Sequence, residues 1–258
     1  MTRETDETRA TASPWFARAT RAEPRARIFC FGHAGAGAAA FRPWGEIFPP
    51  EVEICAVRLP GREKRISEEP YRTAAELLPP LLEVMRGELD LPYGLFGHCS
   101  GALIALSLAS ALVSEGAAEP SLLCISGQTP PGRRERSAPV AEMSFDELVE
   151  HVRALGGMDP EILEDRELLE LLAPLLRADF ELAESLADEP SASLSAPVSV
   201  LAGRDDVIGH EDLLAWRHAT TGPFTLRLLS AGHFYGDEEW RLVARLVARD
   251  LEDALALA

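Results

Sequence analysis

Short apolar runs alternate with helical patterns along most of the 258-residue chain. Each run is nearly continuous in apolar residues, as a parallel strand covered on both faces requires. The six runs lie at 26–31, 52–57, 91–96, 121–126, 197–202 and 223–228. Helical patterns lie between them and after the last, at about 73–89, 101–115, 211–220 and 237–256. This alternation predicts an α/β fold with a doubly wound, mostly parallel sheet.

The interval 129–196 departs from this alternation because it contains no convincing strand. Within it, Ser144 and Glu147 have the spacing of a capping box, and the glycines at 156–157 form a helix stop. A second strongly helical run covers 165–187, where Pro174 predicts a break. We predict a helical lid that lies over the carboxyl edge of the sheet.

The N-terminal segment differs from the rest of the chain in its lack of an apolar run. The first 13 residues are polar and hold no apolar segment, which argues against a secretory signal. We therefore predict a flexible leader over residues 1–24. Residues 25–258 are predicted to form a single α/β domain that includes the lid at 129–196.

Charge limits the partners that the chain can bind. Its 25 Lys and Arg residues and 42 Asp and Glu residues give a net charge of −17. That charge argues against nucleic acid and against an anionic membrane surface. Two basic segments, 58–65 and 132–136, are candidate contacts for an acidic partner, and ordinary solvated loops are the alternative.

Cysteine usage points to a reducing compartment. Cys30, Cys55 and Cys124 fall in predicted strands, and no spacing resembles a metal site or a disulfide framework. No apolar run approaches the roughly 18 residues that a membrane span needs. These features predict a cytoplasmic protein.

The fourth cysteine, Cys99, lies in a glycine-flanked turn between a predicted strand and a predicted helix. The residues at 97–101 read Gly-His-Cys-Ser-Gly, between a strand and a helix. This spacing is typical of a nucleophile elbow, where the chain turns sharply and flanking glycines remove clashes. The helix that follows would favour a thiolate at Cys99. A buried structural cysteine at a tight turn is the alternative.

A base and an acid follow in the order that this architecture requires. His233 comes after the last predicted strand, and two acids, Asp205 and Asp206, come after the strand before it. His233 would accept the proton of Cys99, and Asp206 would orient the imidazole. Asp205 remains open as the acid.

The loop at 31–44 is rich in glycine and alanine and follows the first predicted strand. In this architecture an oxyanion hole takes one amide from that loop and one from the residue after the nucleophile. We assign the backbone N–H groups of Ala34 and Ser100. A phosphate-binding loop is the alternative, although the glycine spacing fits neither nucleotide fingerprint.

Six stretches together resemble the type II thioesterases that act beside polyketide and nonribosomal peptide synthetases, within the α/β-hydrolase fold. They read FCFGHAGAGAAAFRPW, VRLPGRE, FGHCSGALIA, LRADFELAE, AGRDD and GPFTLRLLSAGHFY. The resemblance implies hydrolysis of acyl groups stalled on the phosphopantetheine arm of a carrier protein, without a cofactor. It implies Cys99 as nucleophile, Asp206 as acid and His233 as base.

Cys99 itself departs from the family, which usually has serine there. Some relatives with cysteine at this position are acyl or aminoacyl shuttles between carrier proteins. Transfer between carriers is therefore the first alternative to hydrolysis, and a non-catalytic carrier-binding module is the second. The sequence does not distinguish a natural cysteine from an engineered replacement of serine.

Overall fold

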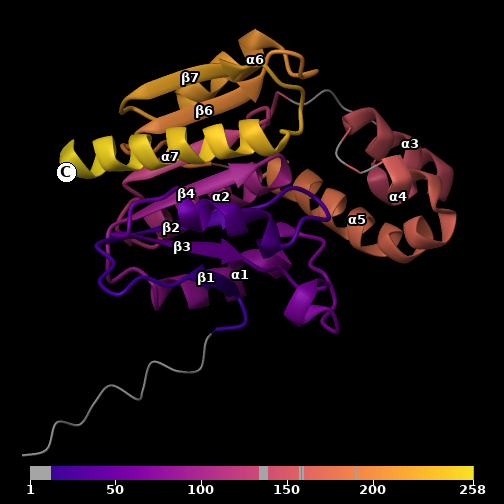
Figure 1. Cartoon of the computed structure of the whole chain (residues 1–258), viewed down its shortest axis with the longest axis horizontal. Coiled ribbons are helices and arrows are strands. Elements are labelled where there is room, and N and C mark those ends of the chain that lie inside the picture. The colour runs from indigo at the N-terminus through magenta and orange to yellow at the C-terminus, as the bar shows by residue number, and fades with distance from the viewer. Residues whose placement is uncertain (1–12, 134–138, 157, 159, 190, 258) are drawn as a thin grey trace, which may run out of the picture.

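A sheet of seven strands runs through the computed structural model, which describes residues 13–133, 139–156, 158, 160–189 and 191–257 (Figure 1). The strand order is β1-β3-β2-β4-β5-β6-β7. All neighbours are parallel except β1, which is antiparallel to β3. The strands are β1 (Phe16–Ala19), β2 (Ala26–Phe31), β3 (Val52–Val57), β4 (Tyr93–His98), β5 (Leu122–Ser126), β6 (Val198–Gly203) and β7 (Phe224–Leu229). The predicted fold class is confirmed.

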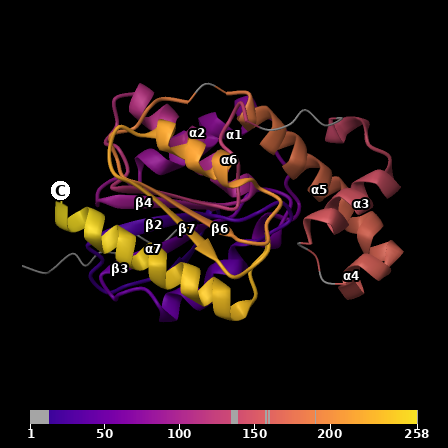
Figure 2. The same cartoon turned by 90° about the horizontal axis from the view of Figure 1, so that it is seen from above.

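Helices cover both faces of this sheet. The α-helices are α1 (Ala74–Arg86), α2 (Ser100–Ser114), α3 (Phe145–Leu155), α4 (Pro160–Glu164), α5 (Arg166–Ala187), α6 (His210–Ala215) and α7 (Asp237–Leu257). The 3₁₀ helices in the described part of the chain are η1 (Ala38–Glu46), η2 (Glu63–Arg65), η3 (Val140–Glu142) and η4 (Trp216–Ala219). Figure 2 shows α7 on one face and α1, α2 and α6 on the other. Among the described residues, no helix is both long and apolar enough to cross a membrane.

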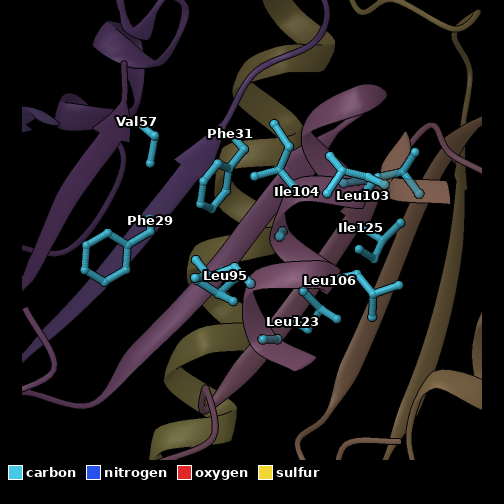
Figure 3. Close-up of a cluster of buried hydrophobic side chains, with 14 of the residues drawn as sticks. Phe29, Phe31, Val57, Leu95, Leu103, Ile104, Leu106, Leu123 and Ile125 are labelled. Atoms are coloured by element: carbon cyan, nitrogen blue, oxygen red, sulfur yellow. The ribbon is translucent and has the colours of Figure 1, made fainter. Parts of the chain in front are cut away.

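Two hydrophobic cores result, one on each face. Along β2, Phe29 and Phe31 point into the core beside α2, whereas Ile28 and Cys30 point into the core beside α7. Figure 3 shows the first core, where Phe29 and Phe31 lie among aliphatic side chains of the neighbouring strands and α2. Because every β2 side chain is buried on one face or the other, the strand is apolar except at Arg27, whose guanidinium pairs with Glu53.

The predicted leader is too long, because part of it belongs to the sheet. Residues 16–19 form β1 on the edge next to β3. Trp15 is 9% exposed and stacks on Tyr71, and the Arg65 guanidinium lies over its ring. Burial of these aromatic rings stabilises the pairing of so short a strand. Residues 1–12 lie outside the described residues.

The described residues between β5 and β6 form helices and no named strand, as the pattern predicts. Helices α3, α4 and α5 gather at the end of the sheet toward which the strand arrows point (Figure 1). The capping box of Ser144 and Glu147 is present, and Gly156 ends α3 in the left-handed conformation. The predicted break at Pro174 is wrong, because α5 continues through it. A missing N–H at one position is tolerated in a helix of 22 residues that packs along its length.

The segment 58–65 is not an exposed basic surface. Its three arginines are buried, with Arg58 bound to Glu63, Arg62 to Asp179 and Arg65 to Glu68. Their charges are neutralised by acids, so the segment supports the fold instead of receiving a partner. Of the other basic segment, Arg133 lies 3.7 Å from Asp212, and residues 134–138 lie outside the described part of the chain.

Candidate active site

Cys99 lies at the sharp turn between β4 and α2. Its φ of 53° and ψ of −123° place a non-glycine residue in a conformation that L residues rarely adopt. The turn is closed so tightly that a Cβ on Gly97 would lie 2.2 Å from the Gly101 oxygen. A Cβ on Gly101 would lie 2.3 Å from the Phe31 oxygen. The geometry is that of a nucleophile elbow, and both glycines are required by close backbone contacts.

The tightness of the elbow predicts a large effect of a single methyl group. We expect Gly101→Ala to lower the free energy of unfolding by about 3 kcal/mol or more, because backbone cannot yield as a side chain can. Gly87→Ala is the matched control, since its Cβ would meet Val84 at an ordinary 3.6 Å. Urea unfolding measures both. Equal stability of the two variants would contradict this account of the turn.

His233 and Asp206 approach the elbow from the loops after β7 and β6. His233 Nδ1 lies 2.9 Å from Asp206 Oδ2. The Asp206 side chain is fully buried and that of His233 is 9% exposed. Asp205 is exposed at the surface, so the structure pairs Asp206 with the imidazole.

Charge around His233 favours its protonated form. Burial opposes the imidazolium, but the Asp206 carboxylate and the Cys99 sulfur more than offset it and raise the pKa of His233 to about 10. On the far side of the ring, Nε2 is buried and has no hydrogen-bond partner of ordinary geometry among the described residues. The ring is therefore held by Asp206 at one nitrogen and free to exchange a proton at the other.

Two backbone N–H groups near the elbow have no acceptor among the described residues. They belong to Ala34, in the loop after β2, and to Ser100, the first residue of α2. The Ser100 amide also lies at the positive end of the α2 dipole. Both amides are therefore available to a substrate oxygen.

Residues of α3 and α5 and Met158 lie over Cys99 and leave only a narrow cleft beside it. Lining residues come from the core (His33, Ala34, Cys99, Phe234) and from the lid (Val152, Leu155, Met158, Leu176, Phe180). The lid contributes only apolar side chains to this cleft, so the wall that faces Cys99 is apolar.

Two further histidines close to the elbow in space, His98 and His33, have structural contacts. His98 is 2% exposed, and its Nδ1 lies 3.1 Å from the Ser126 hydroxyl. Burial lowers the pKa of His98, so its ring is neutral. His33 Nδ1 lies 2.9 Å from the Ala34 carbonyl oxygen and shapes the loop that carries that residue.

Sequence reasoning missed one buried charge at the site, Asp179 of α5. It is 4% exposed and pairs with Arg62. One signal was present: an acid between Ala178 and Phe180, on the helix face that the apolar residues bury. Among the described residues, no group of three or more His, Cys, Asp or Glu side chains is arranged to hold a metal ion.

Comparison with known proteins shows which family the chain belongs to. The model of the thioesterase domain matches residues 26–253, which is most of the chain. The chain belongs to the thioesterase family. This thioesterase is a thioester hydrolase, and the match spans both the elbow and the loop of His233.

Several relatives of this thioesterase are known. It is 35% identical to thioesterase PikA5 of Streptomyces venezuelae over 88% of this chain and 84% of that protein. It is 29% identical to the gramicidin S biosynthesis protein GrsT of Aneurinibacillus migulanus, over 94% and 95%. The solved type II thioesterase BorB of the borrelidin cluster superposes with a TM-score of 0.82 at 32% identity, over 92% and 97%. These matches place the thioesterase in the type II group.

Proposed function

We propose that this thioesterase hydrolyses acyl or aminoacyl thioesters on the phosphopantetheine arm of a carrier protein, through a covalent intermediate on Cys99. The observation that carries the proposal is the strained elbow at Cys99 together with an imidazole that Asp206 orients and whose other nitrogen is buried and without a partner among the described residues. The named relatives support the substrate class, because they serve gramicidin S and borrelidin biosynthesis. Membership of an enzyme family also favours catalysis over a non-catalytic module.

In the first half-reaction, the Cys99 thiolate attacks the thioester carbonyl. The carbonyl oxygen becomes an oxyanion, which the amides of Ala34 and Ser100 stabilise. When the tetrahedral intermediate collapses, the bond to the pantetheine sulfur breaks and that sulfur takes the proton of the His233 imidazolium. The acyl group is then a thioester of Cys99.

In the second half-reaction, water attacks the acyl group on Cys99. His233, now neutral, accepts one proton of that water, and the same two amides stabilise the second oxyanion. Collapse releases the acid and returns the Cys99 thiolate beside protonated His233. Asp206 keeps its hydrogen bond to the ring and stabilises the imidazolium formed in each cycle. Side chains and backbone amides supply all of this chemistry, so we propose that no cofactor takes part.

The proposed partner is an acyl or peptidyl carrier protein. With a net charge of −17 on this chain, an acidic carrier must dock on apolar or locally basic surface. Arg133 and the two arginines at 134 and 136 are the remaining basic candidates. Arg133 is half-exposed and near Asp212, and the other two lie outside the described residues.

Transfer between two carriers is a second candidate, favoured by the sulfur itself. A serine acyl-enzyme is an oxygen ester, from which transfer back to a thiol is uphill. An acyl group on Cys99 is a thioester, nearly equal in free energy to the substrate. A second pantetheine thiol can give its proton to His233, attack the acyl group and expel the Cys99 thiolate reversibly.

An experiment with two carriers separates hydrolysis from transfer. The enzyme is mixed with one acylated and one empty carrier of different mass, and both carriers are followed by intact mass spectrometry. We expect free acid as the main product. An acyl group that reaches the second carrier faster than acid forms would overturn hydrolysis as the main role. Cys99→Ser is the matched variant, because its ester intermediate can pass to water but not readily to a thiol.

Two neighbouring acids provide a test of the triad. We expect Asp206→Asn to lower kcat by about 10²-fold to 10⁴-fold, because an amide cannot hold the same tautomer or stabilise the imidazolium. Asp205→Asn is the control and should stay within about twofold of the unchanged enzyme, since its side chain is exposed. Steady-state hydrolysis of a soluble acyl thioester measures both. A reversed order would assign the acid to Asp205.

A further inference from the structure

A buried ion pair joins the lid to the segment that follows β3. Asp179, on α5, and Arg62 are 4% and 6% exposed. Arg62 Nη2 donates to Asp179 Oδ1 at 2.6 Å, and Nη1 donates to Oδ2 at 2.9 Å. The contact is bidentate, which fixes orientation as well as distance. It joins parts of the chain that are 117 residues apart.

The same pair holds the loop that carries Ala34. Asp179 Oδ2 accepts the N–H of Gly35 at 2.7 Å. Arg62 Nη1 donates in addition to the carbonyl oxygen of Ala36 at 2.9 Å. The two residues that follow Ala34 are therefore tied to the lid helix and to its buried arginine.

His33 holds the loop from the other side. Its Nδ1 donates to the Ala34 carbonyl oxygen at 2.9 Å, since a carbonyl can only accept. The N–H of Ala36 donates to the His33 carbonyl oxygen at 2.9 Å. Both peptide planes that flank the Ala34 Cα are thus fixed by hydrogen bonds, and the Ala34 N–H is left without an acceptor among the described residues.

We propose that Asp179 is a positioning residue for thioester chemistry, which with Arg62 docks the lid helix and holds the Ala34 amide where the oxyanion forms. The proposal rests on the proposed function, which gives that amide its role. A buried ion pair is weak evidence for stability, because apolar residues often replace one without loss. A donor placed about 1 Å from its best position, in contrast, loses much of its effect on rate.

The docking of α5 and the geometry of the oxyanion loop depend on each other. Because Asp179 belongs to α5, the Gly35 amide has its acceptor only while α5 is docked on the core. The oxyanion loop is then complete when the cleft over Cys99 is closed, and movement of α5 would release it. Closure of the lid and activation of the carbonyl are coupled through one carboxylate.

The test compares Asp179→Asn with Glu181→Gln, which removes a charge from the outer part of the same helix, where Glu181 binds Arg72. Two reactions are measured: hydrolysis of a soluble acyl-pantetheine thioester, and alkylation of Cys99 by iodoacetamide at about pH 6. Alkylation uses the thiolate but forms no oxyanion. Burial raises the pKa of the Cys30, Cys55 and Cys124 thiols, so alkylation reports on Cys99.

We expect Asp179→Asn to lower kcat by about 10-fold to 100-fold with little change in KM, while its alkylation rate stays within about twofold. Glu181→Gln should leave both rates within about twofold. An unchanged kcat in Asp179→Asn would overturn the proposal. So would a parallel loss of hydrolysis and alkylation, which marks general disruption of the elbow.

A second variant keeps the test decisive if Asp179→Asn does not fold. Arg62→Lys retains the buried charge but loses the bidentate contact, and the same separation of kcat from alkylation is expected. The Cys99→Ala variant distinguishes a failure of the proposed function from a failure of the positioning role. Turnover that survives in Cys99→Ala would overturn the proposed function, whereas an unchanged kcat in the Asp179 and Arg62 variants overturns only the positioning role.

Discussion

Replacing Cys99 with alanine is expected to lower thioester hydrolysis by about 10⁴-fold or more. The change removes the atom that would form the covalent intermediate, and it leaves the elbow with a smaller side chain that the turn accepts. What remains is the effect of binding and of the two backbone amides, which act only on an attack by water. Steady-state hydrolysis of a soluble acyl thioester measures the loss.

Ser100→Ala is the control for this variant, because it keeps the Ser100 amide and removes a hydroxyl beside the turn. It should retain activity within about threefold. A severe loss in Ser100→Ala together with an active Cys99→Ala would assign the nucleophile to the neighbouring serine. Thermal melting of both variants checks that the fold is kept.

Replacing His233 with alanine is expected to lower hydrolysis by about 10³-fold or more. Without the imidazole, the leaving sulfur loses its proton donor and the attacking water loses its base. The Cys99 thiolate also loses its positive neighbour, so alkylation by iodoacetamide at about pH 6 should slow as well. Both rates are compared with those of a simple thiol.

His218→Ala is the matched control for this variant, since that imidazole is exposed at the surface. It should leave hydrolysis and alkylation unchanged. Near-normal hydrolysis in His233→Ala would overturn the triad. An alkylation rate of the unchanged enzyme no higher than that of a simple thiol would remove the case for an activated Cys99.

The raised pKa of His233 also predicts a dependence of stability on pH. A group whose pKa is higher in the folded state stabilises the fold fully below its ordinary value of 6.5, and that contribution is lost as the pH rises through about 10. The unchanged enzyme should therefore exceed His233→Ala in unfolding free energy by more at pH 6 than at pH 10. Urea unfolding at the two pH values measures the difference. A constant difference would show that His233 has no raised pKa.

Six of the seven strands described in the sheet could be predicted, because each of the six carries its own apolar signal. β2 and β4 lie between helices on both faces, so nearly all their side chains must be apolar. β1 has only four residues at the edge of the sheet and is fixed by packing of Trp15 and Phe16, which periodicity does not reveal. Pro174 was misleading for a related reason, because tertiary packing maintains α5 despite one missing N–H.

Distant contacts limited what the sequence could say about the site. The elbow and the loops of Asp206 and His233 follow an order along the chain that a known architecture explains. No such order along the chain indicates which residues the segment 58–65 contacts. Its charges suggested a docking surface, but Arg62 finds its partner 117 residues away, on a helix whose position over the core no local pattern defines.

The fate of the acyl group in the first half-reaction tests covalent catalysis by Cys99 most directly. The enzyme is mixed with an acyl carrier protein, quenched with acid within milliseconds, digested and examined by peptide mass spectrometry. We expect the mass of the acyl group on the peptide that contains Cys99, rising before free acid appears and absent from Cys99→Ala. Acid released at the normal rate with no acyl group on Cys99, or with the group on Ser100, would contradict the account.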